Sequence, residues 1–439
     1  MSTTGTEKKG FKMTLTRQIM IATVVGLVAG IVVGPAIAPV KVVGDIFLRL
    51  ILMALPVFIM GLVTESVGSI KPKDLGRMGV KVLTLFVMTT SIAAVIGVAL
   101  AFIIQPGAGM PAMELTQEAV ATDTPLSQII LNFFPSNIIA SLSSGNLVQV
   151  IFFAIFLGMA SAIHVEKTGD TRFIDLVHST NKTIRTIIEM VMKVAPYGVA
   201  ALLANVAGTM GAAVIIPLLK YLVALTIGTV LVIVIMLLIT STYCKVSPVK
   251  LAGKMFDMAA IAFTTTSSAM ALPIKMKDAE NKMGVSKRIS RIVNPLGTVF
   301  NSDGQTLFLA LAIVMISQFF NLDLSFGRLL TIIVLTTLAS LGTPGVPGGG
   351  LVVFAAMTVT LGLPLEGIAL IAGVDWFRGA IVTVANVTDD AMVSMMIAKS
   401  EGEWSREIFN GNVELDEDGE VIESERHRIF GTPEAEGAQ

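Results

Sequence analysis

Two polar, helix-breaking segments interrupt the apolar runs of this chain, and each would be costly inside a lipid bilayer. They are residues 264–268 (Thr-Thr-Thr-Ser-Ser) and residues 340–350 (Ser-Leu-Gly-Thr-Pro-Gly-Val-Pro-Gly-Gly-Gly). In hydrocarbon, irregular backbone survives only where protein or a water-filled cavity supplies its hydrogen bonds. Two such segments in one chain therefore indicate a ligand or ion site near the middle of a membrane.

The composition independently places the chain in a membrane. It is 54% hydrophobic and only 14% charged, with a mean hydropathy of +0.80, values typical of integral membrane proteins. The net charge of −1 argues against nucleic acid as a partner. The single cysteine, Cys244, excludes an intrachain disulfide framework and a cysteine-cluster metal site. The three histidines show no metal-ligand spacing.

Apolar runs of about 20 residues or more predict eight membrane-spanning helices. Lys and Arg gather on alternate connections, so the positive-inside rule predicts that even-numbered spans end inside and both termini are cytoplasmic. Residues 1–13 then form a cytoplasmic leader, and the acidic residues 400–439 form a mobile, solvated tail. The predicted spans are residues 14–38, 42–69, 78–104, 126–163 (broken at Pro135), 174–206, 213–243, 288–317 and 364–398.

The same charge pattern predicts two hairpins that do not cross the membrane. Residues 251–285 have basic residues at both ends, so this segment must enter and leave by the inner face. Residues 326–362 lie between a span that exits outside and one that returns inward, so they form a hairpin from the outer face. Two hairpins of opposite polarity, each preceding a span, are typical of an inverted repeat whose tips meet near the midplane.

Spans seven and eight carry carboxylates, which are expensive within a membrane and therefore indicate function. Asn301 and Gly304 flank Asp303 closely, so we expect the helix to unwind there and free backbone carbonyl groups. Asn386 and Asp390 are four residues apart and share one helix face. Carboxylate, amide and carbonyl oxygens are hard ligands that suit an alkali cation.

Other polar residues of the spans have two interpretations each. Asp375 either pairs with Arg378, three residues further on, or takes part in the site. Asp389 lies on a different helix face from Asp390, and we expect it to be a solvated or cytoplasm-facing charge. The Thr90-Ser91 pair of span three either bonds back to the preceding turn or helps to bind a cation.

These features resemble the glutamate transporter family, the dicarboxylate/amino acid:cation symporters, over roughly residues 14–400. The matching motifs are a Ser-rich first hairpin ending in Leu272-Pro273, Asn-x-Asp-Gly in span seven, Gly-x-Pro-Gly in the second hairpin, and Asn386-Val387-Thr388-x-Asp390. The resemblance implies an all-α polytopic homotrimer that works as an elevator. Its scaffold domain would comprise residues 14–77 and 126–206, and its transport domain spans three, six, seven and eight with both hairpins.

The resemblance also implies the site residues, position by position. Thr90, Ser91, Asn301 and Asp303 match one sodium site of the family. The carbonyls of Gly297, Asn301 and Asn386 with the Asp390 carboxylate match a second, and the carbonyls of Ser340, Leu341 and Thr343 a third. Ser268, the hairpin backbone and Asn386 match the groups that hold the main carboxylate of the substrate. The implied substrate site comprises Thr266, Ser267, Ser268, Gln305, Val346, Gly379, Val382, Thr383 and Asn386.

Several positions depart from the family's pattern. Val382 stands where members that carry acidic substrates have an arginine, and Thr266 where some have a second arginine. Gly379 replaces the aspartate that takes the amino group of the substrate. Ser302 and Gln305 replace a Met and a Thr, which leaves the third sodium site and the number of coupled ions open.

These departures predict that the substrate is not an acidic amino acid or a C4-dicarboxylate. A buried dicarboxylate without a guanidinium partner loses its strongest, charge-assisted hydrogen bonds. Two replacements stay open: Arg378 for the missing guanidinium, and Gln305 or Asp375 for the missing amino-group ligand.

The sequence therefore predicts a sodium-coupled symporter of a small carboxylate-bearing organic solute, an amino acid or an organic acid, in the plasma (inner) membrane. Sodium is the only cofactor expected, and membrane lipid and further copies of the chain are the expected partners. Proton coupling is the main alternative. A passive anion channel is less favoured, because no ring of charged residues typical of a pore occurs. No nucleophile and base lie together at membrane depth, so we expect no enzyme.

Overall fold

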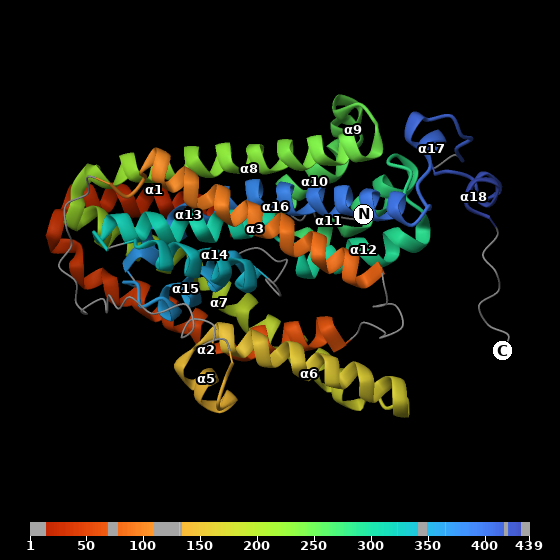
Figure 1. The fold of residues 1–439 in the computed structure, drawn as a ribbon. Coiled ribbons are helices and arrows are strands. Elements are labelled where there is room, and N and C mark those ends of the chain that lie inside the picture. Colours follow the sequence, from red (N-terminus) through yellow and green to blue (C-terminus); the bar gives the residue numbers. More distant parts are fainter. Residues whose placement is uncertain are drawn as a thin grey trace, which may run out of the picture.

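The computed structural model describes residues 15–68, 78–108, 131, 134–322, 324–340, 349–364, 366–416 and 420–431. Over these residues the regular structure is α-helical, apart from short 3-10 turns, a π-helical turn at residues 78–79 and two isolated β-bridges. Six apolar helical stretches among them are long enough to cross a membrane. The all-α class of fold is confirmed, and Figure 1 shows the long helices lying side by side.

Helices α2, α7, α11 and α12 each continue through one proline. In chain order the helices are α1 (Leu15–Val33), η1 (Gly34–Val40), α2 (Lys41–Gly68), α3 (Val80–Ile104), α5 (Ile138–Ser144), α6 (Leu147–Thr168), α7 (Arg172–Met210), η3 (Gly211–Val214), α8 (Ile215–Cys244), α9 (Pro248–Lys254), α10 (Phe256–Thr265), α11 (Ser268–Asn281), α12 (Lys287–Phe300), α13 (Asp303–Phe319), α14 (Phe326–Ser340), α15 (Gly349–Thr360), α16 (Glu366–Ser400), α17 (Arg406–Asn410) and α18 (Glu423–Phe430).

The long helices follow the predicted spans, with shifted ends. The apolar stretches 17–68 and 172–244 each contain two long helices, which the turns η1 and η3 connect. Pro135 lies in a non-helical stretch, as predicted, but a second break falls at Gly145. Gly145 has a left-handed backbone (φ +70°) that ends α5, and the side chain of Asn146 caps α6.

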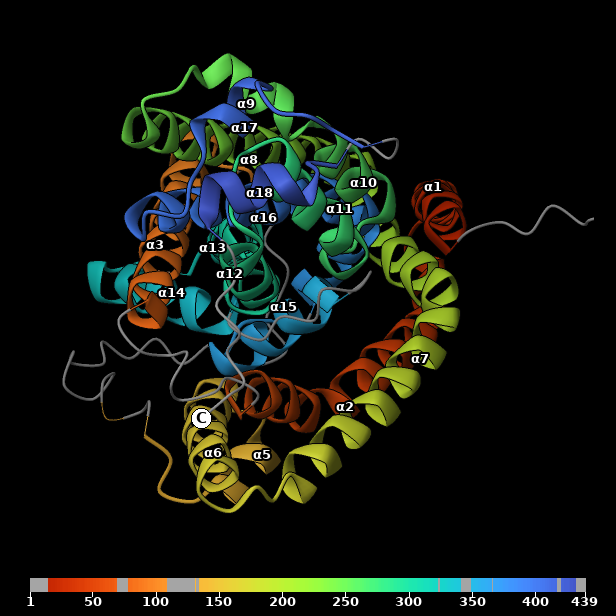
Figure 2. The same ribbon diagram turned by 90° about the vertical axis from the view of Figure 1, so that its right-hand side faces the viewer.

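Two groups of helices make up the structure. In Figure 2, which views the molecule from one end of its long axis, α1, α2, α6 and α7 form an arc beside a compact bundle of the other long helices. Helix α7 packs along both α1 and α2. A Cβ atom added to Gly26 would lie 2.5 Å from the carbonyl oxygen of Ala200. Glycine therefore lets α1 and α7 approach as closely as helices do in membranes.

Helix α13 forms the core of the compact bundle. All its residues except Gln318 are buried, and it packs against α3, α8 and α16. Its first residue, Asp303, is 0% exposed. The helix therefore starts in the middle of the protein with a carboxylate, and that start positions the candidate site.

Two pairs of helices lie within the ranges 251–285 and 326–362 that the charge pattern assigns to hairpins. Helices α10 and α11 pack against each other and against α16, and their connection is only Thr266 and Ser267. Helices α14 and α15 form the second pair, and residues 341–348 between them lie outside the described residues. In Figure 1 the pair α10–α11 lies toward the end that carries α17 and α18, and the pair α14–α15 toward the other.

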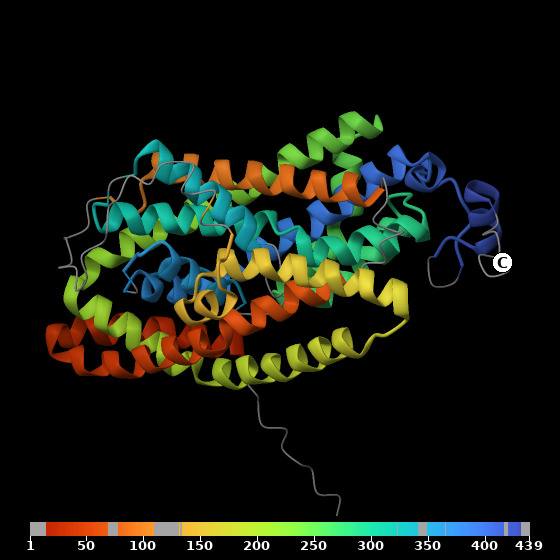
Figure 3. The same ribbon diagram turned by 60° about the horizontal axis from the view of Figure 1, so that its bottom comes forward.

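The C-terminal segment differs from the mobile tail that the sequence predicted. Over the described residues 400–416 and 420–431 it forms α17 and α18, which cap one end of the molecule in Figure 3. The buried Arg426 donates hydrogen bonds to the carbonyl of Val421 and to the side chain of Asn281 at the end of α11. Three acidic residues of this segment take part in docking, because Glu403, Glu420 and Glu423 pair with lysines and an arginine of α11 and α12.

Candidate functional site

A break between α12 and α13 places polar groups in the core. Helix α12 ends at Phe300, Asn301 and Ser302 leave the helical conformation, and α13 starts at Asp303. The predicted unwinding is confirmed. The amide oxygen of Asn386 on α16 accepts a hydrogen bond of 2.9 Å from the backbone N–H of Gly304. One of the free backbone groups at the start of α13 is thereby satisfied.

Asp303 and Asp389 form a pair of buried carboxylates. Each is 0% exposed, and none of their four oxygen atoms has a hydrogen-bond partner among the described residues. Asp303 lies close enough to interact with Asp389, Thr89 and Thr90. Two buried carboxylates without donors are costly unless a cation or a proton joins them. The pair is therefore a candidate cation site.

The expectation that Asp389 is solvated is wrong. Helix α16 packs against α12 and α13 as well as against α8, α10 and α11. It therefore has no face open to solvent at this level, and both Asp389 and Asp390 are 0% exposed. The expectation assumed that one helix face would be free.

The threonines of α3 lie beside this carboxylate pair. The hydroxyl of Thr89 is 3.1 Å from the amide oxygen of Asn301 and 3.1 Å from the carbonyl oxygen of Phe86. Thr90 is buried and donates to the carbonyl of Phe86, whereas Ser91 is half-buried. Thr89, which sequence reasoning passed over, is thus part of the network.

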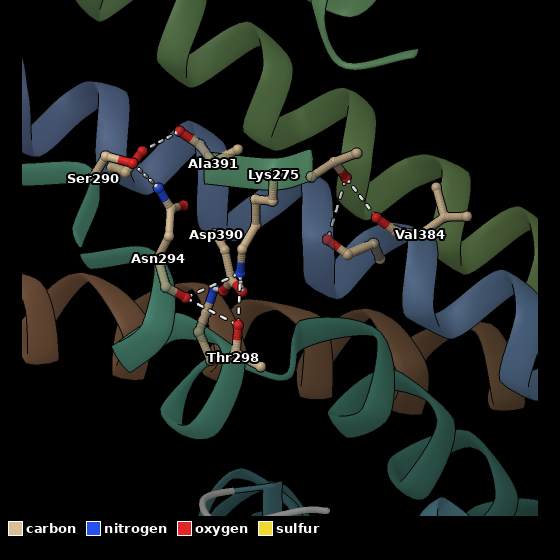
Figure 4. A network of polar contacts seen from close by, with 11 residues as sticks. Lys275, Ser290, Asn294, Thr298, Val384, Asp390 and Ala391 are labelled. Atoms are coloured by element: carbon tan, nitrogen blue, oxygen red, sulfur yellow. Dashed lines mark hydrogen bonds and ion pairs between the residues drawn. The ribbon is translucent and has the colours of Figure 1, made fainter. Parts of the chain in front are cut away.

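Asp390 belongs to a second network, which Figure 4 shows. Its Oδ2 atom is 2.5 Å from the ammonium nitrogen of Lys275, and its Oδ1 accepts from Asn301 at 3.1 Å. Gly297 lies directly against this carboxylate, since a Cβ atom there would come within 2.5 Å of Oδ1. The predicted ligands Gly297, Asn301 and Asp390 are therefore brought together.

Sequence reasoning missed Lys275. We considered charges only within spans seven and eight, whereas this lysine lies in the first hairpin, two residues after Pro273. The signal was present, because a charge within an apolar membrane segment indicates function in a hairpin as much as in a span.

The tip of the first hairpin lies against α16. Thr266 has a left-handed backbone (φ +51°) that ends α10, and the side chain of Ser267 caps α11. A Cβ atom on Gly379 would lie 3.7 Å from the Cβ of Thr266, so the tip faces this glycine. The first turn of α11, starting at the buried Ser268, offers the backbone N–H groups that the resemblance assigns to a carboxylate.

Arg378 lies one helical turn before Val382 and reaches the predicted substrate site. It is 3% exposed; its Nε donates to Asp375 at 2.7 Å and its Nη1 donates to Gln305 at 2.9 Å. A Cβ atom on Gly350 would lie 2.3 Å from Nη1. The guanidinium therefore lies between α13, α16 and the start of α15.

The remaining predicted residues are placed as follows. Val382 is buried, and the hydroxyl of Thr383 donates to the carbonyl of Gly379, which is ordinary bonding within a helix. The hydroxyl of Ser340 likewise donates to the carbonyl of Thr337. Leu341, Thr343 and Val346 lie outside the described residues.

Comparison with known proteins agrees with this architecture. A profile of the Sodium:dicarboxylate symporter family matches residues 15–400. The chain is 32% identical over 411 residues to the proton/sodium-glutamate symport protein of Bacillus caldotenax, covering 90% of this chain and 96% of that protein. It is 32% identical over 421 residues to the proton/glutamate-aspartate symporter of Escherichia coli (91% and 95%). It is 30% identical over 406 residues to the C4-dicarboxylate transport protein of Xanthomonas campestris (89% and 90%).

Long apolar helices around buried carboxylates and two helical hairpins define a membrane transporter, not an enzyme. The chain belongs to the Sodium:dicarboxylate symporter family. The resemblance found in the sequence motifs is confirmed over nearly the whole range expected.

Proposed function

We propose that this protein is a sodium-coupled symporter of the plasma membrane that carries a small dicarboxylate without an amino group. The hairpins α10–α11 and α14–α15 act as inner and outer gates. The arc of α1, α2, α6 and α7 acts as the scaffold of a homotrimer, and the compact bundle moves against it as an elevator. Membership of the family and the division into two helix groups support this proposal.

The proposed coupling site is the Asp303–Asp389 pair. Its four carboxylate oxygens lack donors, and the hydroxyls of Thr89 and Thr90 lie nearby. Carboxylate and hydroxyl oxygens are hard ligands that suit sodium. A proton shared between the two carboxylates is the alternative, and some relatives are named as proton symporters.

The single observation that carries the substrate proposal is the placement of Arg378. The sequence favoured a non-acidic substrate because position 382 is a valine, but residues 378, 382 and 386 lie on one face of α16 at four-residue spacing. The Arg378 guanidinium therefore supplies a positive charge one helical turn before position 382. It donates a hydrogen bond to Gln305, and both side chains lie against Gly350 at the start of α15. A carboxylate distal to the one held by α11 can pair with this group.

We infer that the substrate has no amino group from the pairing of Asp375 with Arg378. Gly379 replaces the family's aspartate that binds the amino group of the substrate. Asp375, one helical turn before Gly379, is already paired with Arg378. A substrate ammonium would have to compete with the guanidinium for that carboxylate. The glutamate and aspartate carried by some relatives are therefore less suited to this site than a C4-dicarboxylate, which another relative is named as carrying.

Uptake into proteoliposomes tests both parts. We expect saturable uptake of labelled succinate or malate that requires an inward sodium gradient at equal pH on both sides. Unlabelled glutamate, aspartate and alanine should compete at least tenfold more weakly. Uptake driven by a pH gradient without sodium would contradict sodium coupling. Equal competition by glutamate would contradict the substrate assignment.

A further inference from the structure

Lys275 stands where a second sodium ion would be expected. Its side chain is 0% exposed, and its ammonium nitrogen lies 2.5 Å from Asp390 Oδ2, 2.8 Å from Thr298 Oγ1 and 3.0 Å from the backbone oxygen of Asn294. An ammonium has three N–H donors, so these three acceptors satisfy it fully. Figure 4 shows the ammonium among these oxygens.

The surroundings of this ammonium are those of a cation site. A carboxylate, a hydroxyl and a backbone carbonyl are the oxygen types that bind alkali cations. The carbonyl of Asn294 is directed to Lys275, while its side-chain amide donates to Ser290 at 3.1 Å. The second carboxylate oxygen of Asp390 is taken by Asn301. Asp390 therefore has no oxygen without a partner, in contrast to Asp303 and Asp389.

A sodium ion does not fit beside this ammonium. It would have to bind the same carboxylate within a few ångströms of a fully buried positive charge, where water cannot screen the repulsion. The residues that the resemblance assigns to the second sodium site, Gly297, Asn301, Asn386 and Asp390, are thus present, but their only charged ligand is already neutralised.

We propose that Lys275 is a built-in cation that replaces sodium at the Asp390 site of this protein. The ammonium is attached to the chain, so it is not released with the substrate. Sodium binding is then confined, within the part of the chain that the structure describes, to the Asp303–Asp389 pair. This inference rests on the cation-coupled symport proposed above and reduces by one the sodium ions that the family pattern implies.

Replacement of Lys275 by a neutral residue should open the Asp390 site to sodium. We would measure the Tm of purified full-length protein in sodium chloride against choline chloride at constant ionic strength. Lys275→Met leaves the buried Asp390 carboxylate without a positive partner, so the Tm of this variant should fall in choline. Its Tm should then rise with sodium by more than the wild-type protein's does, because a ligand that binds the folded state stabilises it.

Two further variants control this experiment. Lys277→Met removes a partly exposed lysine of the same helix and should show the wild-type sodium response. Lys275→Met/Asp390→Asn removes both charges, and its sodium response should return to the wild-type size. This double variant also decides the question if Lys275→Met alone fails to fold.

Two results would overturn the inference. One is a sodium response of Lys275→Met no larger than that of the wild type. The other is loss of the wild-type response in the double variant, which would make Asp390 a sodium ligand. A wild-type protein without any sodium response would contradict the proposed sodium coupling, while a response gained only in Lys275→Met would still support the role of Lys275.

Discussion

Asp303 and Asp389 come from different helices, α13 and α16, and lie together in the core without a hydrogen-bond donor for any of their four oxygens among the described residues. Asp303 lies in the core because the helix breaks just before it and α13 starts there. Asp389 lies in the core because neighbouring helices enclose α16. Their juxtaposition concentrates negative charge that a bound cation or a shared proton would offset.

Asp389→Asn should weaken cation binding while stabilising the cation-free protein. Two unit charges 4 Å apart interact by about 4 kcal/mol at an effective dielectric constant of about 20, so the loss of one carboxylate should lower sodium affinity by more than about tenfold. The repulsion between the carboxylates is lost as well, so the Tm in choline should rise. Thermal unfolding across a sodium titration measures both effects.

The matched control is Asp170→Asn, since Asp170 lies on the surface beside Arg172. It should keep the wild-type sodium response. An unchanged sodium midpoint in Asp389→Asn would exclude this carboxylate from the coupling site.

Gly350→Ala, at the start of α15, should impair transport. Its Cβ would lie 2.3 Å from Arg378 Nη1 and 2.6 Å from the side-chain oxygen of Gln305, so either the guanidinium or α15 must shift. We expect the KM for the dicarboxylate to rise about tenfold or more, with the sodium response of the Tm retained. Gly327→Ala on α14 is the control, because only one atom, 4.0 Å away, lies near its Cβ. Equal KM values for the two variants would contradict the placement of Arg378.

Gly297→Ala should disrupt the pairing of Asp390 with Lys275. The added Cβ would lie 2.5 Å from Asp390 Cγ, and overpacking of this kind costs about 1–3 kcal/mol. We expect a lower Tm in both sodium and choline. A Cβ atom at Gly253 on α9 would have no other atom within 4 Å. Gly253→Ala should therefore change the free energy of unfolding by no more than about 0.5 kcal/mol and leave the Tm nearly unchanged. If Gly297→Ala had the same Tm as the wild type, α12 would be able to move away from α16 and make room for the methyl group.

Arg426→Ala should release α18. The variant loses the hydrogen bonds to Val421 and Asn281, and bonds from a charged donor contribute about 1.5–3 kcal/mol each. Cleavage of the tail by a glutamate-specific protease should therefore accelerate about tenfold or more. Arg172→Ala, a surface arginine whose side chain is 89% exposed, should leave the rate unchanged. A cleavage rate for Arg426→Ala equal to that of the wild type would show that other contacts hold α18.

Acid should release the same segment. The hydrogen bond from Lys287 holds the pKa of Glu423 below its ordinary value. A carboxylate with a lowered folded-state pKa stabilises docking above its unfolded pKa, and this stabilisation is lost as pH falls through the folded value. The wild-type cleavage rate should therefore rise at acid pH, measured with a protease active there. Glu423→Gln should already cleave faster at neutral pH and show a smaller acid effect.

The ranges of the long helices and of the two helix pairs were predictable because the bilayer imposes rules that a sequence displays directly. A span needs a certain apolar length, whereas the face from which each helix pair enters stays a prediction from the positions of lysines and arginines. The unwinding at Asn301 was predictable for the same reason, since a polar motif interrupts an apolar run. The surroundings of Asp389 and Lys275 were not, because they depend on which helices enclose a given face. The C-terminal segment was misjudged because its acidic composition suggests solvation, while its basic partners lie over 100 residues away in the sequence.

The docking of α17 and α18 also determines what a probe on this segment would report. Val421 and Arg426 are held by Asn281 at the end of α11, and Trp404 donates to the carbonyl of Met283 just after it. A fluorophore attached to α18 would therefore report the position of α11. Energy transfer from it to a second dye on α6, in the arc, would follow the movement of the compact bundle proposed above in a single molecule and in real time.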